Sequence, residues 1–301
     1  MVECEYLTIS EEDMNTIERK AYAKINLGLD VIRKRADGYH EVCMIMQTIH
    51  LYDSVTINRL NTEGIRVKTN LPYLPTNQDN IVNRAAKLFQ GACHIRQGVG
   101  ISLVKNIPVA AGLAGGSADA AATLIGLNEL YQTNLSTEEL MKLGVSLGAD
   151  VPYCILMGTA LSEGIGEVLT PLKPMPPCDI LLVKPDISVS TKYVYEHLIL
   201  NELTLHPNIP KMLTALEDGN LTSLTNCMDN ILQTVTTKNY PIVNRIKDKM
   251  IEMGALTSIM SGSGPTVFGI FNDSEASRKA YQYFKNGNYG KQVFLTKPYW
   301  P

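Results

Sequence analysis

Polar and apolar residues alternate in short runs along the first part of the chain, from Ile17 to about Leu60. Successive side chains of a β-strand point to opposite faces, so this alternation predicts strands. Asp37-Gly38 interrupts it, and this dipeptide is typical of the tight turn of a β-hairpin. The first part of the chain is therefore predicted to be rich in β-structure.

Apolar residues later recur with the spacing of a helix, and the predicted helices are residues 80–91, 117–131, 136–148 and 239–255. Ser117 is predicted to be the N-cap of the second helix. Ser136 and Glu139 have the spacing of a capping box at the start of the third. Glycine is expected to end three of the four, at Gly91, Gly148 and Gly254.

Three further stretches predict strands: residues 98–108 with Pro108 as the stop, residues 179–185, and a strand–glycine turn–strand over residues 256–271. Strands and helices are mixed without strict alternation, which predicts an α+β fold and not a doubly wound sheet. The proline-rich segment 167–179 is interpreted as a linker or domain crossing. We expect an N-terminal domain over residues 1–163, with residues 1–13 a tail and Met14 nearer the structural start, and a C-terminal domain over residues 164–301.

Composition excludes several classes of protein. The formal charge of −3 has no basic excess, which argues against a nucleic-acid surface, and no apolar run is long enough for a membrane span. The acidic N-terminus has no apolar core typical of a signal peptide. Six scattered cysteines without a CxxC pair favour buried thiols in a reducing cytoplasm over a zinc site or disulfides. The sequence contains no heptad pattern, so it does not predict an oligomeric state.

The stretch "IPVAAGLAGGSADAAATL", Ile107 to Leu124, carries glycines where a strand passes into a helix. Glycines let backbone N–H groups approach an anion, and the start of a helix adds partial positive charge. The spacing fits neither a P-loop nor a dinucleotide fingerprint, so a phosphate site and a structural turn both stay open on spacing alone. Gly262-Ser263-Gly264-Pro265 is either a second backbone wall or a hairpin.

Three motifs in order, "YAKINLGLD", "PVAAGLAGGSADAA" and "SGSGPTVFGIF", resemble those of the GHMP kinase superfamily. "GYHEV" and "GADVPY" resemble the branch that phosphorylates a cytidyl-diphospho methylerythritol in the non-mevalonate isoprenoid pathway. The likeness runs from about Ile17 to Phe294. It implies a kinase with a ribosomal protein S5 domain 2-like N-terminal domain and a ferredoxin-like C-terminal domain, and with ATP and substrate in the cleft between them.

The resemblance also implies roles for particular residues. Asp150 is implied as the base that accepts the proton of the alcohol, with Lys24 as its cationic partner. The segment implied to wrap the ATP phosphates is Pro108, Val109, Ala110, Ala111, Gly112, Leu113, Ala114, Gly115, Gly116, Ser117 and Ala118, and Lys105 and Asn80 are implied on the adenine side. Asn26, Tyr39, His40 and Tyr195 are implied to hold the substrate, with His40 on the cytosine edge. No fixed metal site is expected, and Mg²⁺ is expected to arrive with ATP.

The chain departs from the family pattern at four positions, Tyr22, Met157, Ile165 and Asp186. None of them is an implied catalytic residue. Two other functions remain as alternatives: another GHMP kinase that acts on homoserine or mevalonate, and a silent binding protein on the same scaffold.

Overall fold

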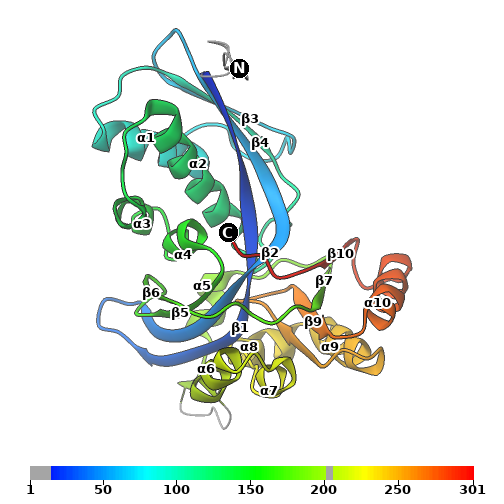
Figure 1. The fold of residues 1–301 in the computed structure, drawn as a ribbon. Coiled ribbons are helices and arrows are strands. Elements are labelled where there is room, and N and C mark those ends of the chain that lie inside the picture. The colour runs from blue at the N-terminus through cyan, green and yellow to red at the C-terminus, as the bar shows by residue number, and fades with distance from the viewer. Residues whose placement is uncertain (1–14, 201–205) are drawn as a thin grey trace, which may run out of the picture.

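The computed structural model describes residues 15–200 and 206–301. The predicted tail at residues 1–13, Met14 and Cys4 lie outside the described residues. The described part contains two β-sheets with helices packed against them (Figure 1).

The first sheet is built around two long strands. Its members are β1 (Thr16–Lys34), β2 (His40–Arg59), β3 (Ile65–Thr69), β4 (Val99–Val104), β5 (Thr159–Glu163) and β6 (Val168–Pro171). Strand β2 pairs with β1 and also with β4 and β5, so the order is β3-β4-β2-β5-β6 with β1 beside β2. All pairs are antiparallel except β3 with β4. The predicted Asp37-Gly38 turn joins β1 to β2, which confirms the hairpin.

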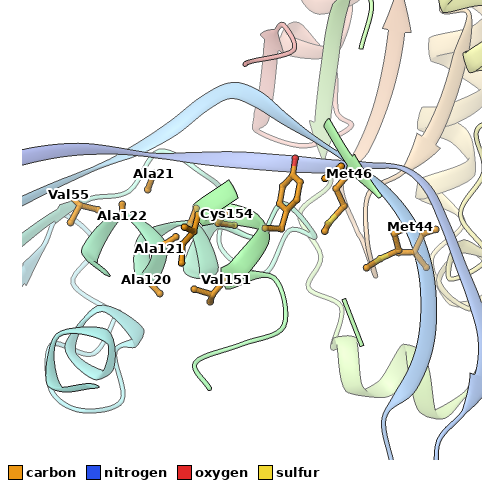
Figure 2. Close-up of a cluster of buried hydrophobic side chains, with 14 of the residues drawn as sticks. Ala21, Met44, Met46, Val55, Ala120, Ala121, Ala122, Val151 and Cys154 are labelled. Atoms are coloured by element: carbon orange, nitrogen blue, oxygen red, sulfur yellow. The ribbon is translucent and has the colours of Figure 1, made fainter. Parts of the chain in front are cut away.

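Helices α1 (Ile81–Ala92), α2 (Gly115–Tyr131), α3 (Thr137–Val145) and α4 (Val151–Leu156) gather beside this sheet (Figure 1). Helix α2 packs closely on the first sheet because the residues of its inner face are small. Figure 2 shows its alanines, Ala120 to Ala122, in the buried cluster that also contains Val55 of β2. A Cβ on Gly126 of α2 would approach the end of the Ile57 side chain to 2.6 Å, so a larger residue there would force that side chain to shift.

The second sheet is antiparallel and has the order β10-β7-β9-β8. Its strands are β7 (Asp179–Lys184), β8 (Thr257–Met260), β9 (Val267–Phe271) and β10 (Gln292–Thr296). The fourth strand of the set lies beside the first and the third separates the first from the second, as in a ferredoxin-like sheet. The helices of this half are α5 (Thr191–Glu196), α6 (Ile209–Glu217), α7 (Leu221–Thr225), α8 (Gln233–Asn239), α9 (Ile242–Glu252) and α10 (Ser274–Asn286).

Strands β1 and β2 contribute to both halves of the molecule. Ile25 and Leu27 of β1 are fully buried in a cluster with Met212 of α6 and with Phe268 of β9. The same two strands carry the packing surface for α2. The α+β class predicted from the sequence is thus confirmed. Strand β6 still pairs with β5, so the chain changes sheet between Pro171 and Asp179, later than the predicted division at residues 163 and 164.

Several predicted helix ends were wrong. Helix α1 runs through Gly91 to Ala92, because Gly91 is exposed and needs no left-handed conformation. Helix α2 begins at Gly115, because Ala114 adopts the left-handed conformation and takes the N-cap position that Ser117 was expected to hold. Helix α3 ends at Val145, before Gly148, although its Ser136–Glu139 capping box is confirmed.

The strand predicted to stop at Pro108 also ends early, at Val104. The backbone N–H of Lys105 donates to the Asn70 side chain just after β3, and those of Asn106 and Ile107 donate to the Asp53 side chain of β2. The five described cysteines are free thiols; Cys154 and Cys178 are buried, and burial raises the pKa of Cys154. None of the described helices is both long and apolar enough to cross a bilayer.

Candidate active site

A cavity of about 910 Å³ lies where the glycine-rich loop, the β1–β2 hairpin and α5 meet. The residues assigned to the site from the sequence all line it, except Ala118, which is buried behind the loop. The segments that form the walls are therefore far apart in the chain but share one space.

Lys24 and Asp150 face each other across this cavity. The Lys24 ammonium is buried, lies 3.6 Å from Asp150 Oδ2 and donates a hydrogen bond to Asn26 Oδ1 at 2.7 Å. Asp150 occupies the N-cap position of α4 but makes no capping hydrogen bond, and its side chain is 32% exposed. The carboxylate is thus beside a cation and free to contact a ligand.

The strand pairing opens at Lys24, and this opening admits the glycine-rich loop. The β1–β2 register shifts between Tyr22 and Lys24. There the backbone N–H of Lys24 donates to Leu113 O of the loop at 3.1 Å, while β2 pairs with the C-terminal segment through Ile49 and Pro298. The glycine-rich loop is therefore hydrogen-bonded directly to Lys24, the residue that faces Asp150.

The glycine-rich loop has an unusual backbone. Ala110, Gly112 and Ala114 have φ values of 51°, 75° and 56°, so left-handed residues alternate with ordinary ones. Such alternation turns successive N–H groups toward one side and makes a concavity suited to anions. The loop continues into the first turn of α2, whose first N–H groups have no partner within the helix. Holding alanine in this conformation costs roughly 1–2 kcal/mol per residue.

The late glycine segment packs against this loop. Ser261 Oγ donates to Gly112 O at 2.9 Å, and a Cβ on Gly112 would approach Ser261 O to 2.2 Å. Asn230 fixes the late segment from behind, because its buried amide donates to Met260 O and Gly262 O, both at 2.7 Å. Gly262 and Ser263 line the cavity, so this segment is a second backbone wall of the site.

Lys105 is buried beneath the loop between two carboxylates. Its ammonium bonds to Asp53 and, at 2.6 Å, to Asp119 Oδ2. The other oxygen of Asp53 accepts from the backbone N–H of Asn106 and Ile107 at 2.5 and 2.7 Å. Burial opposes the charge of Lys105, but the two carboxylates outweigh it and raise the pKa of the ammonium. Burial also raises the pKa of Asp119 well above its usual value.

At the opposite end of the cavity an imidazole faces a phenol ring. The ring centroids of His40, at the start of β2, and Tyr195, in α5, are 5.1 Å apart. Burial, assisted by the nearby Lys34, lowers the pKa of His40, so the ring is neutral at pH 7 and offers one donor and one acceptor. Tyr39 also lines the cavity but is 59% exposed at the hairpin turn.

Asn80 lines the cavity and also caps α1, accepting from Val82 N at 3.1 Å. The sequence reasoning missed Asp53, Asp119 and Asn230. Asp119 had a signal, because it is an acid within a helix of small residues. Asp53 and Asn230 had none, since their partners come from distant segments.

The four departures from the family pattern have different structural consequences. Tyr22 stacks on Tyr299 of the C-terminal segment, with ring centroids 4.0 Å apart and planes at 16°. Met157 has a φ of 62°, a conformation that favours glycine. Ile165 lines the cavity, and Asp186 lies just after β7 and outside the cavity lining.

Comparison with known proteins agrees with this architecture. Residues 80–158 match the GHMP kinases N terminal domain, and residues 212–290 match the GHMP kinases C terminal domain. A crystal structure of 4-(cytidine 5′-diphospho)-2C-methyl-D-erythritol kinase superimposes with a TM-score of 0.80 at 32% identity, covering 94% of this chain and 99% of that one.

Two curated relatives are similar over nearly their whole length. The chain is 59% identical over 284 residues to 4-diphosphocytidyl-2-C-methyl-D-erythritol kinase of Lachnoclostridium phytofermentans, covering 94% of this chain and 98% of the relative. It is 48% identical over 288 residues to the protein of the same name from Lachnospira eligens, covering 96% and 100%. The chain therefore belongs to the 4-diphosphocytidyl-2-C-methyl-D-erythritol kinase family of GHMP kinases.

Proposed function

We infer that the protein is a kinase that transfers the γ-phosphoryl group of ATP to the 2-hydroxyl of 4-diphosphocytidyl-2-C-methyl-D-erythritol. One observation supports this most strongly. The cavity places the Asp150–Lys24 pair on the same walls as an anion-binding backbone loop and a His40–Tyr195 ring pair. A nucleotide, an alcohol and a pyrimidine base each find a suitable partner there.

In the proposed reaction Asp150 acts as the base. The substrate oxygen attacks the γ-phosphorus, and its proton passes to a carboxylate oxygen of Asp150. The bond between the γ-phosphorus and the bridging oxygen breaks, and ADP leaves. The buried ammonium of Lys24, 3.6 Å from Asp150 Oδ2, is proposed to orient the carboxylate and to stabilise negative charge on the transferred group.

The glycine-rich loop is proposed to hold the ATP phosphates through its backbone. The alternating left-handed residues and the free N–H groups of α2 support this role. Lys105 lies under the loop with its charge already neutralised, so we propose that it braces the loop and the adenine side without contacting a phosphate.

Mg²⁺ is proposed to enter with ATP and to neutralise phosphate charge. Residues 15–200 and 206–301 contain no group of three or more His, Cys, Asp or Glu side chains placed to hold a metal. The Ser117 hydroxyl, on the cavity wall in the first turn of α2, is a hard oxygen ligand that fits a Mg²⁺ bound mainly by phosphates and water.

The cytidyl group is proposed to lie against the rings of His40 and Tyr195, with Tyr39 beside it and Asn26 near the sugar alcohol. Neutral imidazole can donate to one atom of the cytosine edge and accept from another. The free thiols are compatible with a reducing cytoplasm, which we propose as the location.

The test is a coupled assay of ADP release with ATP and Mg²⁺, in which the cytidyl substrate, homoserine and mevalonate are compared at equal concentrations. Turnover with the cytidyl substrate alone is expected. Turnover with homoserine or mevalonate instead would retain the kinase and refute the cytosine site. Tight ATP binding without turnover of any of the three alcohols would refute the proposed function.

A further inference from the structure

The positive charges of the cavity are not equivalent. Among the described residues, the lysines on its walls are Lys24, Lys34, Lys105 and Lys192. Lys24 is paired with Asp150, and Lys105 is enclosed by two carboxylates. Lys34 and Lys192 therefore carry the positive charge that the described part of the cavity leaves least compensated.

Each of these two lysines lies beside one ring of the His40–Tyr195 pair. Lys34 ends β1 and is directly opposite His40 in the β1–β2 register, so the two side chains share a face. Lys192 lies in α5 three residues before Tyr195, a spacing that places the two side chains on neighbouring positions of a helix. The ring contact of 5.1 Å thus brings both lysines to the same end of the cavity.

The neighbouring arginines form ion pairs with carboxylates, whereas Lys34 and Lys192 are available to bind an anionic ligand. Arg33 pairs with Glu41, and Arg35 pairs with Asp37. In residues 15–200 and 206–301 no carboxylate lies within ion-pair distance of Lys34. Lys192 has only a loose contact of 3.8 Å with Glu196, and its side chain is 83% exposed. An ion pair at that exposure contributes little to stability, so Lys192 can leave Glu196 for another anion at little cost.

We infer that Lys34 and Lys192 bind the diphosphate of the cytidyl substrate, one from each wall of the cavity. The inference rests on the proposed function. If the cytosine lies against the rings of His40 and Tyr195 and the reacting hydroxyl lies at Asp150, the diphosphate that joins them must cross the space between the ring pair and Asp150. Its negative charges would otherwise face the carboxylates of Glu196 and Asp150, which line the same cavity. The two lysines favour substrates with a diphosphate over cytidine itself.

The first experiment measures KM for both substrates in Lys34→Met, Lys192→Met and the double variant. Each single change is expected to raise KM for the cytidyl substrate about tenfold to a hundredfold, the usual range for a hydrogen bond to a charged group. KM for ATP should stay within about twofold of wild type, and Lys34→Arg and Lys192→Arg should restore most of the affinity. Arg33→Met is the matched control, because it removes the same charge from the same strand end outside the cavity lining.

The second experiment separates the lysines from the base-binding rings. Binding of cytidine and of cytidine 5′-diphosphate is measured by calorimetry, with the ATP site saturated by a non-hydrolysable ATP analogue. Wild type should prefer the diphosphate, and the double variant should lose that preference while it keeps its affinity for cytidine. An unchanged preference, or a rise in KM for ATP in place of the cytidyl substrate, would overturn the inference.

The two experiments also separate this inference from the proposed function. Wild-type protein that does not phosphorylate the cytidyl substrate refutes the function. Wild-type protein that does so, with variants of unchanged KM, refutes the lysine site alone.

Discussion

The glycine-rich end of the cavity and the end lined by His40 and Tyr195 present different surfaces to a ligand. The first presents backbone: left-handed residues at Ala110 and Gly112, and a buried ion cluster around Lys105 that supports them. The second presents side chains from a hairpin and from the short helix α5. Changes at the first end should therefore appear as lost stability, and changes at the second as lost affinity. The catalytic pair lies on the walls of the same cavity and should affect rate.

The largest expected effect tests the buried cluster. Lys105→Met leaves Asp53 and Asp119 buried without their cation, so the free energy of unfolding should fall by about 3–5 kcal/mol. Urea unfolding followed by circular dichroism measures this loss. Lys87→Met, on an exposed position of α1, is the control and should change stability by less than about 0.5 kcal/mol. A loss below about 1 kcal/mol at Lys105 would show that the cluster does not support this end.

The second prediction concerns rate. Asp150→Asn should lower kcat by ~10²-fold or more, because the amide cannot accept the proton of the hydroxyl. KM for ATP and the urea midpoint should stay near wild type, since Asp150 makes no capping hydrogen bond and is partly exposed. Steady-state kinetics beside the exposed control Asp218→Asn measures this. Near-normal turnover would remove Asp150 from the role of base.

How much of each end could be predicted from the sequence follows from the same comparison. At the glycine-rich end Gly112 has the backbone freedom that its left-handed conformation favours, and it is visible in "AAGLAGGS", whereas the left-handed Ala110 carries no such signal. Spacing left the function of this end open, and the family motifs indicated a phosphate site. Local signals also predicted the hairpin before Tyr39 and the capping box of α3, because turn and cap chemistry act within a few residues.

Contacts between distant segments could not be predicted in this way. Ser261 reaches Gly112 across 149 residues of chain, and Lys105 reaches Asp53 across 52. The left-handed Ala114 is the N-cap of α2, three residues before the predicted N-cap Ser117, and no local signal in the sequence marks it. The lysines beside His40 and Tyr195 are unremarkable in the sequence, and only the fold brings them to one end.

The third prediction tests the side-chain end. His40→Ala should raise KM for the cytidyl substrate about tenfold while kcat and KM for ATP change little, because the base lies away from the reacting atoms. His197→Ala, at the end of α5 and outside the cavity lining, is the control. An unchanged KM would place the cytosine elsewhere.

The pH dependence of KM for the cytidyl substrate tests the role of His40 independently. The pKa of His40 is lowered from 6.5, mainly by burial, so its neutral form persists to lower pH than in free histidine. Protonation removes the acceptor nitrogen, so wild-type KM should rise only on the acid side of pH 6.5. In His40→Ala, KM for the cytidyl substrate should rise at acid pH no more than KM for ATP does.

The smallest expected effect tests whether the backbone of the loop is strained. Ala110 has a φ of 51° and should tolerate glycine well, because glycine adopts this conformation without the steric cost that alanine bears. Ala111 is buried and has an ordinary backbone conformation. Glycine there should destabilise the protein in two ways, because it increases the conformational freedom of the unfolded chain and removes a packed methyl group. Ala110→Gly should therefore be more stable than Ala111→Gly by about 1 kcal/mol in urea unfolding. Equal stabilities would mean that the loop does not hold Ala110 against its preference, and that the phosphate end owes its shape to the ion cluster beneath it alone.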